Sequence, residues 1–211
     1  MERYKRNQVE EAIFRTLGAR DARLNELKFR IKRLLVTDRR LRRDEDRHYA
    51  FFDQEPPGSG IEVMFSAYDA FALLAAIILL EHGFPQATVV RVMRRVRRQL
   101  AAAHAEILKK DPTTLFDFEA IRAQAKPGMI ATDNTHPVFL VFVKLTASTV
   151  ADQSGGTAIA VCRGHDELIA FIKRHSVPGS GATYFEFVRL MHALAANLLQ
   201  TRPVKRGRGA G

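Results

Sequence analysis

The sequence predicts a mainly helical α+β protein in two parts, and three observations support this. Up to residue 110, apolar side chains recur three and four residues apart, as in helices buried on one face. Beyond Asp111-Pro112 the composition changes: the apolar run 137–145 indicates a buried strand, and the run 157–162 indicates a second strand. We therefore expect a helical domain over residues 1–110, a small α/β domain over 111–201, and a disordered basic tail over 202–211.

Two helices are expected at the start of the chain. Asn7 can accept a backbone N–H at the beginning of the first helix, and Gly18 supplies its end. The second helix, over 22–38, combines a buried stripe with a basic surface, so the pair is a helix, a turn and a basic helix. The stripe is Leu24, Leu27, Ile31 and Leu34, and the cations are Arg23, Lys28, Arg30, Lys32 and Arg33.

The pattern then changes to one typical of strands. Two β-rich runs, 49–53 and 61–65, flank Glu55-Pro-Pro-Gly-Ser-Gly, whose Pro and Gly residues favour a turn, so we expect a β-hairpin. Ser66 and Asp69 then form a variant of the capping box, which predicts a third helix over 67–82. That helix is apolar nearly all round and should be buried on most sides.

A fourth helix, over 85–110, has the most regular pattern in the sequence. Its apolar residues alternate at spacings of four and three, which predicts a heptad seam packed against a partner helix. Its arginines, Arg91, Arg94, Arg95 and Arg98, form a separate basic face. The seam consists of Val89, Met93, Val96, Leu100, Ala103 and Ile107.

The region after residue 111 combines helices and strands. We expect a short helix over 118–125, a buried strand over 137–145, a second strand over 157–162, and helices over 166–175 and 183–200. Cys162 lies in the second strand and is interpreted as a small buried hydrophobic residue.

Composition and charge limit the class of protein. The longest apolar run, residues 70–80, is shorter than the about 20 residues of a membrane-spanning helix, and a single cysteine excludes an intrachain disulfide. With no secretory signal in view, we expect a cytoplasmic protein without a membrane partner. The net charge of +10 is concentrated in residues 1–48, residues 91–110 and the tail. This pattern favours a polyanion, DNA or RNA, although solvated helix faces would account for it equally well.

The order helix, basic helix, hairpin, helix and long helix, with Leu80-Glu-His-Gly-Phe-Pro-Gln86 before the last, resembles the MerR-type winged helix-turn-helix regulators over residues 5–110. The resemblance implies a winged helix-turn-helix fold, with the second helix in the major groove of double-stranded DNA and the hairpin as a wing. It also implies a homodimer paired through the long helix. The remaining α/β domain would then serve oligomerisation or the sensing of a small-molecule effector.

The resemblance assigns roles to individual residues. The seam residues Val89, Met93, Val96, Leu100 and Ile107 would pair two chains, and Arg94, Arg95 and Arg98 would follow phosphate or bind acids of the partner. The contacts to DNA would come from Arg23, Lys28, Arg30, Lys32 and Arg33 on the second helix, and from Arg39, Arg40, Arg42 and Arg43 beside the wing.

The expected wing is acidic. It carries Asp53, Glu55 and Glu62, and no Lys or Arg lies between Tyr49 and Val90. Either the hairpin packs against protein, or its backbone amides and tip glycines approach the DNA.

No motif for catalysis is present, and we expect no enzyme activity, metal or cofactor. The seven histidines lack the spacing of a local zinc site, and the Gly-rich segments lack the Gly-Lys-Thr/Ser of a phosphate loop. Two alternatives stay open. The protein could be an interaction or scaffold module whose basic faces bind acidic partners, or its C-terminal half could be an enzyme domain that uses Asp133, His136 and His165.

Overall fold

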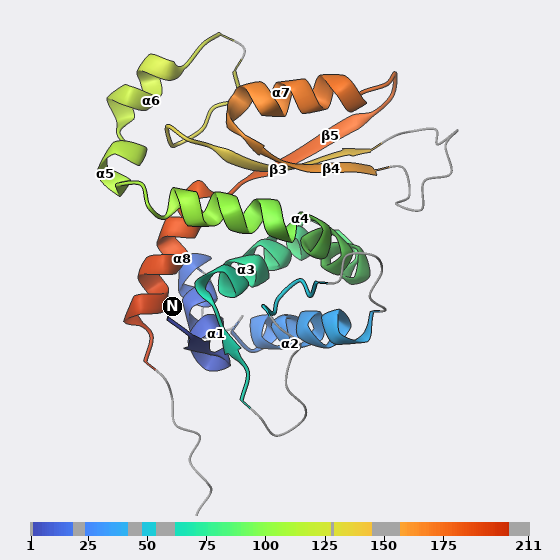
Figure 1. The fold of residues 1–211 in the computed structure, drawn as a ribbon, viewed down its shortest axis with the longest axis vertical. Coiled ribbons are helices and arrows are strands. Elements are labelled where there is room, and N and C mark those ends of the chain that lie inside the picture. The colour runs from blue at the N-terminus through green and yellow to red at the C-terminus, as the bar shows by residue number, and fades with distance from the viewer. Residues whose placement is uncertain are drawn as a thin grey trace, which may run out of the picture. The chain divides into compact units, whose positions relative to one another are not determined.

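The computed structural model describes residues 2–18, 24–41, 48–53, 62–127, 129–144 and 157–202. It has the mainly helical α+β architecture that the sequence predicts (Figure 1). The chain forms two compact units, residues 1–97 with 193–211, and residues 98–192. The units divide the chain inside two helices, whereas the sequence places one boundary at residue 110. Among the described helices, none is both long and apolar enough to cross a bilayer.

The first unit is helical, and its central helix is the apolar one. Helix α3 is buried along most of its length, and it begins with the predicted capping box: Ser66 Oγ accepts from the Asp69 N–H at 3.1 Å, and Asp69 Oδ2 accepts from the Ser66 N–H at 3.0 Å. The elements of this unit are β1 (Tyr4–Lys5), α1 (Arg6–Thr16), α2 (Leu24–Arg40), β2 (Met64–Phe65), α3 (Ala67–Glu81), the first part of α4 (Gln86–Ile107) and the last part of α8 (Val188–Gln200).

Helix α1 begins at Arg6, one residue before the predicted Asn7 cap. The side chain of Gln8 accepts the backbone N–H of Lys5 at 3.0 Å, so this amide at the helix start is satisfied from inside the helix. Asn7 therefore lies in the first turn and not at the cap.

The prediction of a β-hairpin over 49–65 is wrong for the described residues. Met64–Phe65 pairs antiparallel with Tyr4–Lys5, and residues 48–53 form no strand. The backbone groups of this segment bind side chains instead: the N–H groups of Ala50 and Phe51 donate to Asp38 Oδ2 at 2.8 and 3.1 Å. The turn predicted at Glu55-Pro-Pro-Gly-Ser-Gly falls within residues 54–61, which lie outside the described residues.

The second unit is built on a three-stranded antiparallel sheet with the order β4-β3-β5. Helix α7 packs against β3 and β4, on one face of the sheet (Figure 1). The unit also contains the short helices α5 and α6. The bounds are α5 (Pro112–Leu115), α6 (Phe118–Gln124), β3 (Val138–Lys144), β4 (Thr157–Arg163), α7 (Gly164–His175) and β5 (Gly181–Glu186).

Two predicted strands are confirmed as β3 and β4, but β5 was expected to be the start of a helix. Residues 181–186 pair with β3, with Phe185 opposite Leu140 and Thr183 opposite Phe142. Helix α8 starts only at Val188. The β-branched and aromatic residues of this segment suit a strand once β3 is available as a partner.

The central strand β3 is buried on both faces, which accounts for its continuous apolar run. Phe139, Val141 and Val143 share a core cluster with Cys162 and Leu168. The interpretation of Cys162 as a buried hydrophobic residue is confirmed, and burial raises the pKa of its thiol to about 11. A thiol with this pKa is almost entirely protonated at neutral pH and therefore a poor nucleophile.

His104 on α4 is a buried titratable group that should make stability depend on pH. Its side chain is 5% exposed, and burial together with the nearby charge of His192 lowers its pKa to about 4. The unfolded chain would bind a proton near pH 6.5, whereas the folded protein binds it only near pH 4. The free energy of unfolding should therefore fall as pH drops from 6.5 to 4, by up to about 3 kcal/mol.

Urea unfolding at a series of pH values measures this dependence. We expect His104→Leu to flatten the slope between pH 6.5 and 4, and His82→Gln, at an exposed position, to leave it unchanged. An equal slope in the wild type and in His104→Leu would contradict the assignment.

Candidate nucleic-acid interface

Helix α2 presents a cationic face opposite its buried one. The buried side consists mainly of Leu27, Ile31 and Leu34, as the sequence predicts, and the outer side is exposed. At 100° per residue, the exposed cations fall within an arc of about 140°. They form what we call the α2 cationic face: Lys28, Lys32, Arg33, Arg39 and Arg40.

The members of this face differ in how their charge is used. The guanidinium of Arg33 lies 5.8 Å from the ring centre of Phe29, and that of Arg39 lies 5.4 Å from Phe52. Within the described part of the chain, Lys28, Lys32 and Arg40 form no ion pair. Their charge is therefore available to an external anion.

Arg30, also predicted to contact DNA, is engaged within the chain. It forms an ion pair with Glu26, one turn earlier in the helix, and its Nη1 lies 3.9 Å from Glu81 Oε1. Two carboxylates next to one half-buried guanidinium leave little of its charge for a partner.

Phe29 is a feature of this face that the sequence reading did not single out. Its side chain is 59% exposed, on the same side of α2 as the cations. The sequence signal that could have indicated Phe29 is its position, because it is an apolar residue outside the buried stripe of an amphipathic helix. A single exposed apolar side chain is common on protein surfaces, and this ring is also in contact with the guanidinium of Arg33.

Arg94 does not belong to an exposed basic face, and its predicted contact with DNA is wrong. It is 6% exposed, and its Nε donates to Asp38 Oδ1 at 2.8 Å. Its guanidinium also donates to the backbone oxygens of Asp38 and Leu41. Asp38 is fully buried, and a buried carboxylate requires such a partner. Arg95, 100° further round the helix, is exposed, and so is Arg98.

Arg97 lies one turn beyond Arg94 and binds residues 48–53, the described segment that follows α2. It donates to the Ala50 carbonyl oxygen and to Asp53 Oδ1, both at 2.7 Å, and to Asp69 Oδ1 at 2.8 Å. Burial of Asp69 raises its pKa, and the hydrogen bonds from Arg97 and Ser66 oppose that shift. The sequence predicts no role for Arg97, because no local pattern distinguishes this arginine from its exposed neighbours.

The described acids of the expected wing are neutralised inside the chain. Asp53 pairs with Arg3 at 2.8 Å as well as with Arg97, and Glu62 pairs with Lys5 at 2.8 Å. Both acids are therefore paired with cations of the same chain. Glu55 lies outside the described residues.

The heptad seam of α4 is not a free surface, so the predicted pairing of two chains through it is wrong. Its side chains are at most 3% exposed within a single chain. The apolar pattern correctly predicts burial, but a heptad cannot distinguish a partner in the same chain from a second copy. The buried residues are Val89, Met93, Val96, Leu100, Ala103 and Ile107.

The residues of the enzyme alternative each contact a different partner. Asp133 pairs with Arg189, and His165 Nε2 lies 2.8 Å from the Ile130 carbonyl oxygen. His136 lies beside Thr135. Over the described ranges, no three His, Cys, Asp or Glu side chains form a group that could hold a metal. Arg23, Arg42 and Arg43 lie outside those ranges, as do tail residues 203–211.

Comparisons with protein-family models, with curated proteins and with solved structures found no match to this chain.

Proposed function

We propose that the protein is a DNA-binding transcriptional regulator of the MerR-like winged helix-turn-helix type. The observation that carries the proposal is the α2 cationic face, with Phe29 exposed on the same side of the helix. An α-helix fits the major groove, where cations reach phosphates and guanine edges and an apolar ring can contact a thymine methyl. A helix of 17 residues is about 25 Å long, which is sufficient to lie along the groove.

The charge distribution around α2 supports this role for the helix itself. Lys28, Lys32 and Arg40 form no ion pair with described acids, so neutralising phosphates with them would release counterions without first breaking an internal pair. The acids Asp53 and Glu62, which follow α2 in the chain, are already paired within the protein. Asp53 pairs with Arg3 and Arg97, and Glu62 pairs with Lys5. In this proposal α2 supplies the affinity for DNA. Residues 48–53 support the helix on its buried side, where their backbone N–H groups donate to Asp38.

A homodimer remains part of the proposal, because two copies of α2 would read a palindromic site. Its interface would have to lie outside the seam of α4, which is buried. Arg95 and Arg98 stay candidates for phosphate or for acids of a partner.

A salt series with a duplex of random sequence tests the proposal. Five exposed cations predict a plot of log K against log salt with a slope of up to about −4.5, since each neutralised phosphate contributes about −0.9. Fluorescence anisotropy of a labelled duplex from about 50 to 200 mM salt measures the slope.

Absence of binding to the duplex at about 50 mM salt would contradict the proposal. Poly-glutamate provides the matched control for the scaffold alternative, because it carries a similar charge density without grooves or bases. Equal affinity for poly-glutamate and for the duplex would favour a module that binds acidic proteins.

A further inference from the structure

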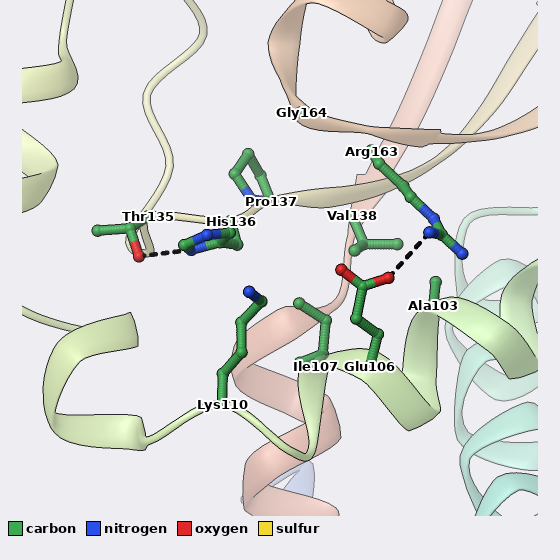
Figure 2. Close-up of a pocket in the computed structure, with 10 residues that line it drawn as sticks. All are labelled: Ala103, Glu106, Ile107, Lys110, Thr135, His136, Pro137, Val138, Arg163 and Gly164. Atoms are coloured by element: carbon green, nitrogen blue, oxygen red, sulfur yellow. Dashed lines mark hydrogen bonds and ion pairs between the residues drawn. The ribbon is translucent and has the colours of Figure 1, made fainter.

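The second unit contains a pocket of about 200 Å³, whose lining shares only Ile107 and His136 with the sites predicted from the sequence. It lies between the end of α4 and the junctions that lead into β3 and α7. Figure 2 shows Ile107, Pro137 and Val138 along its middle, with Lys110 and His136 at one end and Arg163 with Glu106 at the other. The pocket therefore has an apolar wall between two charged ends.

The two ends differ in charge. Arg163 Nη1 lies 2.8 Å from Glu106 Oε2, so this end is a closed ion pair. At the other end the ammonium of Lys110 points toward the imidazole of His136 (Figure 2). Within the described ranges Lys110 forms no ion pair, and its charge lowers the pKa of His136 in addition to the effect of burial. Glu106, which pairs with Arg163 at the other end, acts in the opposite direction on the pKa of His136. This end therefore has the unpaired charge of Lys110.

The hydrogen bonds around His136 direct one ring nitrogen toward a ligand. Thr135 Oγ1 lies 3.4 Å from the Leu115 carbonyl oxygen and 2.9 Å from His136 Nδ1. When the hydroxyl donates to Nδ1, the neutral ring carries its proton on Nε2, and the protonated ring carries a proton there as well. In both cases Nε2–H is left to donate to an anion beside Lys110.

The walls favour a carboxylate over a phosphate. Two of the backbone amides at the start of α7, where phosphate could bind, are already occupied: the Gly164 N–H donates to Pro137 O at 2.8 Å, and the Arg163 N–H donates to Glu167 Oε2 at 2.7 Å. One free ammonium suits a single negative charge, and the apolar middle suits a hydrocarbon body. The volume lies below the roughly 300–1,000 Å³ typical of pockets for drug-sized ligands.

We infer that this pocket binds a small monocarboxylic acid with an apolar body. The carboxylate lies between Lys110 and His136, and the body packs against Ile107, Pro137 and Val138. The site stands on its own geometry and does not depend on DNA binding.

Calorimetric titration of the full chain with hexanoate and benzoate tests the inference. Benzyl alcohol and inorganic phosphate serve as the uncharged and the hydrophilic counterparts. We expect at least one of the two acids to bind about tenfold more tightly than either counterpart, since a charge-assisted hydrogen bond and apolar burial act together only in the acid.

Lys110→Met should weaken binding of that acid about tenfold, and His136→Leu should also weaken it. Lys109→Met is the matched control, because it removes the same charge from an exposed neighbour that does not line the pocket, and it should change affinity less than about twofold. Circular dichroism of each variant verifies the fold.

Three results would overturn the assignment. The first is that neither acid binds at about 10 mM, and the second is that phosphate binds as tightly as the acid. The third is that Lys110→Met retains wild-type affinity.

Discussion

Replacing Lys28, Lys32 and Arg40 with glutamate should abolish binding to DNA at physiological salt. The triple change removes the three cations of the α2 cationic face that form neither an ion pair nor a ring contact with described residues, and it sets three carboxylates against phosphate. We expect the salt slope to fall by about 2.7 and the affinity at about 0.15 M salt to fall roughly 100-fold or more. The three positions are exposed, so the fold should persist.

The matched control reverses the same amount of charge in the other unit. Lys126, Lys173 and Arg174 are exposed there, and replacing them with glutamate changes the net charge equally. If both triple variants lost affinity to the same extent, binding would follow the total charge of the protein, and α2 would lose its special role.

A third set, Arg91, Arg95 and Arg98, tests the exposed arginines of α4. Arg94 is left out because its loss would unfold the site it holds. Loss of affinity in this set without a change of stability would extend the interface from α2 to α4.

Replacing Asp38 with alanine should be among the most destabilising single changes in the protein. The substitution leaves the Arg94 guanidinium buried without its carboxylate, and it leaves the N–H groups of Ala50 and Phe51 without their acceptor. Removing one partner of a buried ion pair costs about 3–5 kcal/mol, against a total stability of about 5–15 kcal/mol for a typical domain. Urea unfolding followed by circular dichroism measures the loss.

The double variant Asp38→Ala with Arg94→Met separates the cost of the isolated charge from the cost of the lost hydrogen bonds. With no buried charge left uncompensated, it should recover part of the stability lost in Asp38→Ala. Arg91→Met, at an exposed position of the same helix, should change stability by no more than about 0.5 kcal/mol. A double variant less stable than Asp38→Ala would show that Arg94 stabilises this region without its carboxylate.

Local patterns in the sequence predict most of the elements. Apolar period, caps and breakers depend on neighbouring residues, and they correctly indicate α2, α3, α4 and the strands β3 and β4, of which β3 is buried and β4 mostly half-buried. The Ser66–Asp69 capping box is also local, and the structure contains it. The α2 cationic face follows from the same reasoning, because a buried stripe at helical spacing leaves its other residues exposed.

Pairing between distant segments could not be predicted in this way. Met64–Phe65 has a strand-like composition, but its partner is Tyr4–Lys5 and not the run twelve or more residues before it. Strand β5 was assigned to a helix because its sequence carries no sign of the edge of β3 that it joins. A strand acquires its hydrogen bonds from elsewhere in the chain, so its formation depends on tertiary structure.

The sequence by itself therefore determined a mainly helical α+β protein with a basic second helix and a buried apolar third helix. Only the tertiary structure decided which cations are available. Arg94 and Arg95 are adjacent and chemically identical, yet one neutralises buried Asp38 and the other is exposed. The same holds for Arg30, which pairs with Glu26 and Glu81, beside Lys28 and Lys32. The physical reason is that the charge a side chain can offer to a partner depends on the burial and the acids around it, and distant residues supply both.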